Sequence, residues 1–222
     1  MKQNKRLKPA AISIPSEKIN EAAEAIALAF HTENFTRTLL NLENKRVLPY
    51  MIKAFELQIK TNILSGFPVW TVIKDNKVAG VAVIKPPGRR KISLHKTAHL
   101  LYRFIKILPI FRFMRIKNIP LLKSLSRKPS FVPEKHSTLD ILAVNPSFQG
   151  QGVGRILFEK LKNDSFKKNN CSGIYLLTGN ESNWKIYNHM GFKTILKRKK
   201  KNFTAYHMFL ENENNKGDTN GH

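Results

Sequence analysis

The segment from Gln149 to Gly154, with the sequence Gln-Gly-Gln-Gly-Val-Gly, has residue types and a spacing that suit phosphate binding. It follows an apolar stretch, residues 139–144, that is typical of a strand, and a helix is expected over residues 152–168. Glycines let the backbone approach a ligand closely. The free N–H groups at the start of a helix bind anions through hydrogen bonds and the helix dipole. The segment therefore predicts a phosphate or pyrophosphate site.

Two common phosphate loops do not fit this segment. A Walker loop requires Lys followed by Ser or Thr after its last glycine, where this chain has Arg155 and Ile156. A dinucleotide fingerprint requires three glycines, and after Gly150 and Gly152 the third position is taken by Arg155. For the glycines taken alone, an ordinary tight turn between a strand and a helix is the alternative.

The segment in its context resembles a known family. Residues 142–154, Leu-Ala-Val-Asn-Pro-x-x-Gln-Gly-Gln-Gly-Val-Gly, resemble motif A of the GNAT superfamily of N-acetyltransferases, which is (Arg/Gln)-x-x-Gly-x-(Gly/Ala) after an apolar strand that ends in Val-x-Pro. Downstream, Asn183-x-x-x-Tyr187-x-x-x-Gly191-Phe192 resembles the second signature of that superfamily. The resemblance covers about residues 10–210 and is strongest from His136 to Phe192.

The resemblance implies an enzyme (EC 2.3.1.-) that moves an acetyl group from acetyl-CoA to a primary amine of a small molecule or peptide, by direct attack in a ternary complex and without a metal. The strand that ends at Val144 is expected to splay from the strand of residues 173–177, with pantetheine in the gap. The alternative is a non-catalytic protein of the same fold that binds acyl-CoA, RNA or a membrane surface. The implied contacts to acetyl-CoA are Leu142, Ala143, Val144, Gln149, Gly150, Gln151, Gly152, Val153, Gly154, Arg155 and Asn183.

Tyr187 matches the position of the general acid in this family. Its phenol, with a pKa of ~10, suits protonation of a thiolate leaving group of similar basicity. The structural alternative is a tyrosine that packs its helix against the sheet.

The resemblance does not assign the general base, because many members of the family carry a Glu at the position that Thr138 occupies here. Side chains alternate along a strand, so His136 and Asp140 share the face of Thr138. The imidazole of His136 has a suitable pKa of ~6.5, and the stretch resembles a GNAT subgroup with His and Asp at these places. A solvent-exposed strand-edge histidine, a structural aspartate and deprotonation through water are the alternatives.

Three further residues have chemistry of interest. Glu33 and Asn34 lie between the first two expected helices, where the acceptor often docks in this superfamily, and we expect an exposed loop there. Cys171 has no base in a recognisable motif nearby, and a buried inert thiol is expected.

The elements that must position these residues predict an α/β (α+β) fold. We expect a GNAT-like mixed, mostly antiparallel central sheet of about seven strands, flanked by helices. Asp75-Asn76 is a turn signal between two strands, so these form a hairpin, and Ser16 is a candidate helix cap. The expected strands are 10–14, 69–74, 78–85, 139–144, 173–177, 192–196 and 203–210. The expected helices are 19–30, 43–64, 92–126 with breaks at Pro109 and Pro120, 152–168 and 182–190.

The chain of 222 residues, 41% of them hydrophobic, suits a single domain. We expect that domain over residues 10–210, between a disordered basic arm, 1–9, and a disordered tail, 211–222. The single cysteine allows no intramolecular disulfide, and a reducing cytoplasm is the default. No run of ~18 apolar residues predicts a membrane-spanning helix.

Residues 86–135 are rich in positive charge. We expect them to form a helical insertion before the strand that precedes the glycine turn. The net charge is +24, and residues 76–133 contain no Asp or Glu. Such a balance favours anionic partners. Contact with a membrane surface or RNA is possible through this insertion. The favoured interpretation is an apolar face packed on the domain and a solvated basic face.

Overall fold

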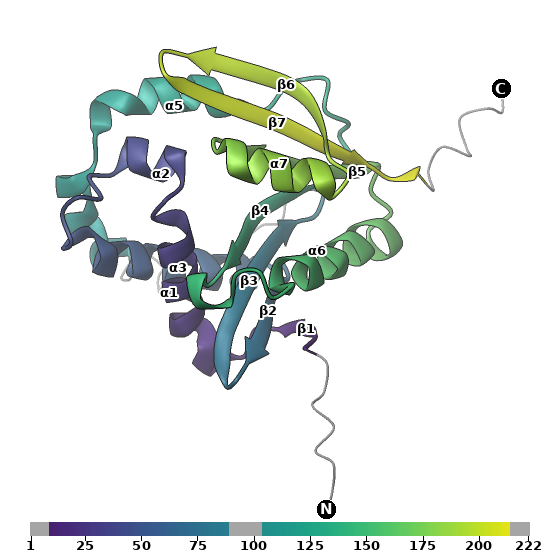
Figure 1. Ribbon diagram of the computed structural model, residues 1–222, viewed down its shortest axis with the longest axis horizontal. Helices are drawn as coiled ribbons and strands as arrows, with labels where there is room; N and C mark the ends of the chain where they lie inside the picture. Colours follow the sequence, from purple (N-terminus) through teal and green to yellow (C-terminus); the bar gives the residue numbers. More distant parts are fainter. Residues whose placement is uncertain (1–8, 89–103, 214–222) are drawn as a thin grey trace, which may run out of the picture.

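The computed structural model describes residues 9–88 and 104–213, which build one seven-stranded sheet (Figure 1). The strand order is β1-β2-β3-β4-β5-β7-β6, and every neighbouring pair except β4 and β5 is antiparallel. This confirms the predicted mixed, mostly antiparallel sheet. The strands are β1 (Ala11–Ser13), β2 (Val69–Lys74), β3 (Lys77–Lys85), β4 (His136–Val144), β5 (Gly173–Thr178), β6 (Lys193–Lys200) and β7 (Phe203–Glu211).

Helices cover both faces of the sheet. Helices α1 (Ile19–Phe30) and α3 (Val47–Leu64) pack on one face, and α6 (Val153–Asn163) packs on the other. A π-helical turn, Asp164–Lys168, continues α6. The other helical elements are η1 (Ser16–Lys18), α2 (Asn34–Leu39), η2 (Leu108–Phe113), η3 (Ile116–Asn118), α5 (Ile119–Ser126), η4 (Pro146–Phe148) and α7 (Glu181–His189).

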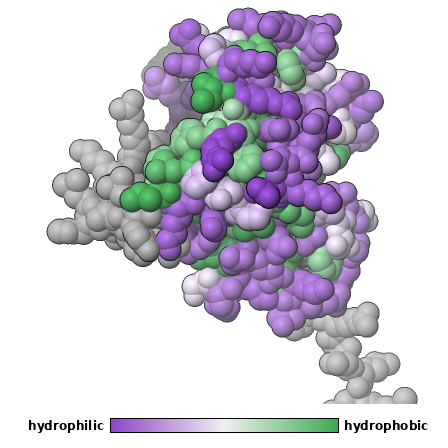
Figure 2. Space-filling model, turned by 90° about the vertical axis from the view of Figure 1, so that its left-hand side faces the viewer, coloured by the Kyte–Doolittle hydropathy of each residue, from purple (hydrophilic) through white to green (hydrophobic). Residues whose placement is uncertain are grey.

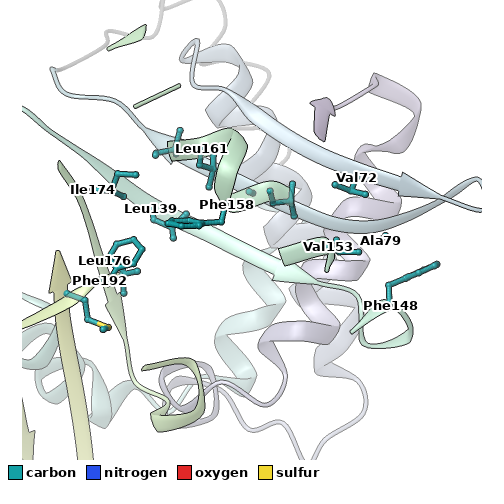
Figure 3. Packing of buried hydrophobic residues seen from close by; sticks show 14 of the residues in the cluster. Val72, Ala79, Leu139, Phe148, Val153, Phe158, Leu161, Ile174, Leu176 and Phe192 are labelled. Atoms are coloured by element: carbon teal, nitrogen blue, oxygen red, sulfur yellow. The ribbon is translucent and has the colours of Figure 1, made fainter. Parts of the chain in front are cut away.

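Strand β3 lies in the middle of the core. Its residues from Val78 to Ile84 are all buried, as expected for a strand with helices on both faces. On the α6 side the core includes Leu139, Val153, Phe158 and Leu176 (Figure 3). A Cβ on Gly80 would lie 2.7 Å from the Val153 side chain, so glycine allows α6 to pack closely on β3.

The β2–β3 hairpin forms at the predicted turn. Asp75 and Asn76 have φ of 50° and 58°, the left-handed conformations that a two-residue type I′ turn requires and that Asp and Asn tolerate. The hairpin places β3 next to β4, which carries most of the expected site.

Strands β4 and β5 separate soon after they meet. Within the described part of the chain they pair only from His136 to Thr138, opposite Gly173 to Tyr175. Beyond Thr138 the side of β4 that faces β5 therefore has no ladder partner. The expected splay is present.

A β-bulge interrupts β4 at Asp140. Val83 pairs with Ile141 and Ile84 pairs with Leu139, so one residue of β4 has no counterpart in β3. Leu139 packs in the α6 core and Ile141 in the α1–α3 core, although residues two apart normally share a face. The bulge therefore changes which face of the sheet the rest of β4 presents.

Several elements differ from expectation. Ser16 does not cap a helix, because it is the first residue of η1, whose N-cap is Pro15, and its hydroxyl bonds to Glu17. The lysine-rich stretch 197–200 is strand, and the turn falls at Lys201. Strand β7 reaches Glu211, one residue into the expected tail. The rest of that tail from 214, residues 1–8 of the expected arm and residues 92–103 of the expected helical segment 92–126 lie outside the described residues.

The insertion is confirmed in its place between β3 and β4, but its apolar residues are not all packed on the domain. Phe104, Ile105, Phe111 and Ile116 are 48%, 61%, 48% and 59% exposed, while Ile107 and Leu125 are buried. Among the described helices, none is long and apolar enough to cross a membrane.

Candidate active site

The glycine turn has the conformation that an anion site requires. Gly150 and Gly152 have φ of 74° and 77°. A Cβ added to either glycine would have no neighbouring atom within 4 Å of it. The glycines are therefore required by the backbone conformation, and the space beside them is open. Non-glycine residues pay about 1–2 kcal/mol in this region.

Helix α6 starts at this turn with its N–H groups free of side-chain capping. Gly152 is the N-cap residue, no side chain caps the helix, and its first turn contains no acidic residue. The first N–H groups of any helix lack intrahelical acceptors and carry the positive end of the dipole. A phosphate group fits these donors.

A cavity of about 720 Å³ begins at the turn and passes between β4 and β5. Its walls come from the glycine turn, the diverging ends of β4 and β5, helix α7, and the segment from Ala29 to Thr36. Nine of the predicted cofactor-binding residues line it: Leu142, Ala143, Val144, Gln149, Gly150, Gly152, Val153, Gly154 and Asn183.

The side chains of Gln151 and Arg155 are exposed and are not among the cavity's lining residues. The Gln151 amide accepts a hydrogen bond from Lys74 and donates one to the Ser147 carbonyl at 3.4 Å. Their side chains therefore take no part in lining the cavity.

Tyr187, on α7, lines the cavity. Its ring packs edge-on against Phe192 with the centroids 5.7 Å apart. Burial, together with the nearby charge of Glu33, raises the pKa of the Tyr187 phenol to about 12. The hydroxyl is therefore fully protonated at neutral pH and can donate a proton.

Glu33 lies in the same cavity and caps α2, a helix that the sequence did not predict. Its carboxylate accepts a hydrogen bond from the Thr36 N–H at 2.9 Å. Burial raises the pKa of this carboxyl above its ordinary value, although backbone N–H groups of Thr36, Phe35 and Gly179 oppose the shift. A carboxylate of raised basicity beside a neutral phenol is a pair suited to acid–base work.

Contacts distant in sequence fix α2 at the site. The Asn34 N–H donates to the Asn180 side chain at 2.9 Å, and the Asn34 amide donates to the Gly179 carbonyl at 2.8 Å. A Cβ on Gly179 would lie 2.9 Å from the Phe35 ring. Glycine at this position lets α2 approach the loop between β5 and α7.

The predicted base candidates lie in different surroundings. Asp140 lines the cavity, but its carboxylate is held by Lys85 at 2.8 Å and by Gln58 at 3.1 Å. His136 is 7% exposed and is not among the residues that line the cavity. Its ring nitrogens contact the Pro133 carbonyl and the Lys128 ammonium, and burial lowers its pKa.

Cys171 is not among the residues that line the cavity. Cys171 is buried with its sulfur 3.1 Å from the Ser137 hydroxyl. Among residues 9–88 and 104–213, no group of three or more His, Cys, Asp or Glu side chains is arranged to hold a metal ion.

Comparisons with known proteins agree with this geometry. Residues 36–192 match the family model described as "Acetyltransferase (GNAT) family". A search of curated protein sequences found no match.

Solved structures of similar fold include three acetyltransferases, one of them in complex with coenzyme A. A Corynebacterium glutamicum protein described as histone acetyltransferase HPA2 and related acetyltransferase superposes with TM-score 0.60 at 17% identity, over 92% of this chain and 97% of that one. The Escherichia coli ribosomal-protein-S18-alanine N-acetyltransferase superposes with TM-score 0.53 at 16% identity, over 92% of this chain and 94% of that one. The Thermoplasma acidophilum PaiA N-acetyltransferase in complex with coenzyme A superposes with TM-score 0.57 at 10% identity, over 93% of this chain and 100% of that one.

Proposed function

The chain belongs to the acetyltransferase (GNAT) family, and on that premise we propose that its acceptor is a primary amine of a small molecule or peptide. Membership makes it an acyltransferase (EC 2.3.1.-) with acetyl-CoA as its co-substrate. One observation carries the proposal: a single cavity joins the anion-binding turn to Glu33 and Tyr187.

The donor half of the cavity suits acetyl-CoA. The pyrophosphate is assigned to the N–H groups from Gln149 to Arg155, so Gln151 and Arg155 contribute through their backbone. Pantetheine is assigned to the unpaired edge of β4 near Leu142, Ala143 and Val144, where backbone N–H and C=O groups have no partner on β5. Asn183, on α7, contacts the same arm.

Acetyl-CoA supplies a thioester for direct attack by a neutral amine. The bond from nitrogen to the acetyl carbon forms, the bond from carbon to sulfur breaks, and the amine loses one proton. Glu33 is assigned as the acceptor of that proton because its basicity is raised by burial. Tyr187 gives its proton to the leaving sulfur.

Asp140 is the second candidate for the base. It lines the cavity, but its carboxylate forms an ion pair with the Lys85 ammonium and accepts from Gln58, whereas the Glu33 carboxylate accepts from backbone N–H groups. His136 is not assigned the role, because it does not line the cavity and its two nitrogens have other neighbours.

A cytoplasmic location stays a prediction that rests on the single cysteine. A contact of the basic insertion with RNA or an anionic membrane surface also stays a prediction. We do not favour either contact as the main function, because the cavity supports acetyl transfer without a contact to RNA or a membrane.

The test is release of the CoA thiol over a panel of primary amines, with and without the enzyme. We expect amine-dependent release that Tyr187→Phe slows by about 10²–10⁴-fold, while CoA binding by calorimetry is kept. A protein that binds CoA but releases no thiol with any amine is the non-catalytic alternative, and that result would overturn the proposal.

A further inference from the structure

A second cavity, of about 370 Å³, adjoins the first one on the side of α2. Phe35, Thr36 and Leu177 line both cavities. Because Glu33 caps α2 two and three residues before Phe35 and Thr36, the second cavity begins close to the proposed proton acceptor. It lies away from the glycine turn, none of whose residues lines it.

The wall of this second cavity is almost wholly apolar. Thr36 and Ser126 are the two lining residues with polar side chains, and among residues 9–88 and 104–213 no charged residue lines the cavity. The apolar lining side chains are Phe35, Leu39, Leu40, Met51, Ala54, Phe55, Ile110, Leu122 and Leu177. In a chain with a net charge of +24, an uncharged cavity beside the reaction centre selects for apolar groups.

The basic insertion builds one side of the cavity. Ile110 comes from η2 and Leu122 from α5. Backbone bonds attach η2 to the end of α2, with the Asn41 N–H 2.9 Å from the Phe113 carbonyl and the Arg115 N–H 2.7 Å from the Leu39 carbonyl. In Figure 2, which views the molecule from the side of α2 and α5, apolar surface is visible between hydrophilic side chains.

The other end of the insertion is fastened to the sheet. The His207 Nε2 donates to the Leu125 carbonyl at 2.9 Å, and Arg198 donates to the carbonyls of Ser124 and Arg127. These bonds hold the C-terminal end of α5 against β6 and β7. The wall is therefore fixed at both ends before a ligand binds, which lowers the entropy cost of binding.

We propose that this cavity receives the apolar body of the acceptor, so that the enzyme acetylates primary amines carried on an alkyl or aryl group rather than polyamines, amino alcohols or charged amino acids. The inference rests on the proposed function. Transfer of apolar area from water favours the bound state, whereas a second charge would be buried without a partner. A volume of about 370 Å³ matches a small ligand.

Three amines with the same number of heavy atoms provide the test: n-hexylamine, 5-amino-1-pentanol and 1,5-diaminopentane. We expect kcat/KM for n-hexylamine to exceed that for the other two by at least tenfold. Along n-alkylamines from propyl to hexyl, kcat/KM should rise about fourfold per methylene, which corresponds to ~0.8 kcal/mol per buried CH₂.

Matched variants locate the effect. Ile110→Ser places a hydroxyl in the cavity wall and should remove most of the preference for n-hexylamine. Ile116→Ser, in the same insertion but 59% exposed and outside the lining, should leave it unchanged. Ala54→Phe fills the cavity and should lower kcat/KM for n-hexylamine with an unchanged KM for acetyl-CoA.

The outcomes separate this inference from the proposed function. If kcat/KM for the amino alcohol or the diamine equals that for n-hexylamine, the inference is overturned and the proposed acetyltransferase activity stands. If no amine gives thiol release although CoA binds, the proposed function fails and the inference fails with it.

Discussion

Tyr187 and Glu33, the acid and the base of our proposal, share their surroundings in one cavity. Both line the cavity, burial raises the pKa of both, and the Glu33 charge contributes to the shift at Tyr187. Motif spacing alone predicted Tyr187. At Glu33 the sequence predicts an exposed loop, because burial of this residue depends on contacts near Gly179 that are distant in sequence.

Tyr187→Phe should lower kcat by about 10²–10⁴-fold, the usual contribution of a positioned general acid. KM for acetyl-CoA should change little, because Phe keeps the contact with the Phe192 ring. Steady-state thiol-release kinetics measure both quantities. A kcat within threefold of the original enzyme would contradict the acid role.

Glu33→Gln tests the base through the pH profile. An acid with a raised pKa loses its basic form as pH falls through the raised value, so the acidic limb of kcat/KM should lie above pH 4.5, the ordinary value. The variant should lose that limb and about 10²–10⁴-fold in rate. Glu33→Asp should keep the limb. Loss of the limb in Asp140→Asn instead would assign the base to Asp140.

At the scale of elements, sequence patterns predict those turns whose conformation depends on a few neighbouring residues. The hairpin at Asp75-Asn76 and the glycine turn before α6 follow from backbone preferences of a few residues, and both formed as expected. Helix α2 and the bulge at Asp140 did not follow from such preferences. The first is stabilised by Asn180, and the second by pairing with β3, so no local pattern reveals either.

The glycine turn can be tested with a matched pair of glycines. Gly152→Ala strains a residue with φ of 77°, and we expect CoA affinity to fall about tenfold as the first N–H groups of α6 shift. Gly88→Ala has a comparable φ of 92° and also open space, but it lies outside the cavity lining. It should leave CoA affinity unchanged. Equal losses in calorimetric titrations would show that the turn has no special role.

At the scale of the whole molecule, a buried polar chain links the sheet to the insertion. His207 is fully buried, and its Nε2 must donate to the Leu125 carbonyl because a carbonyl only accepts. Its Nδ1 is then an acceptor for the Tyr175 hydroxyl at 2.7 Å. Burial lowers the pKa of His207, which is consistent with this neutral form.

The free energy of unfolding should therefore fall as pH drops below 6.5. The unfolded chain gains a proton there, whereas folded His207 resists protonation until pH reaches its lowered pKa, so the stabilisation present above pH 6.5 is lost through that window. His207→Gln keeps one donor and one acceptor and should flatten the fall, apart from the share due to His136. Denaturant titrations at pH 7.5 and 5.5 measure this, and an unchanged slope would contradict it.

The most direct test of the central claim is transfer of an isotope-labelled acetyl group, followed by mass spectrometry. With labelled acetyl-CoA and n-hexylamine or another amine that supports thiol release, we predict one N-acetylated amine for each CoA thiol formed, and no label left on the protein. Thiol release without labelled amide would contradict transfer to an amine. Label retained on the protein would contradict direct attack in a ternary complex.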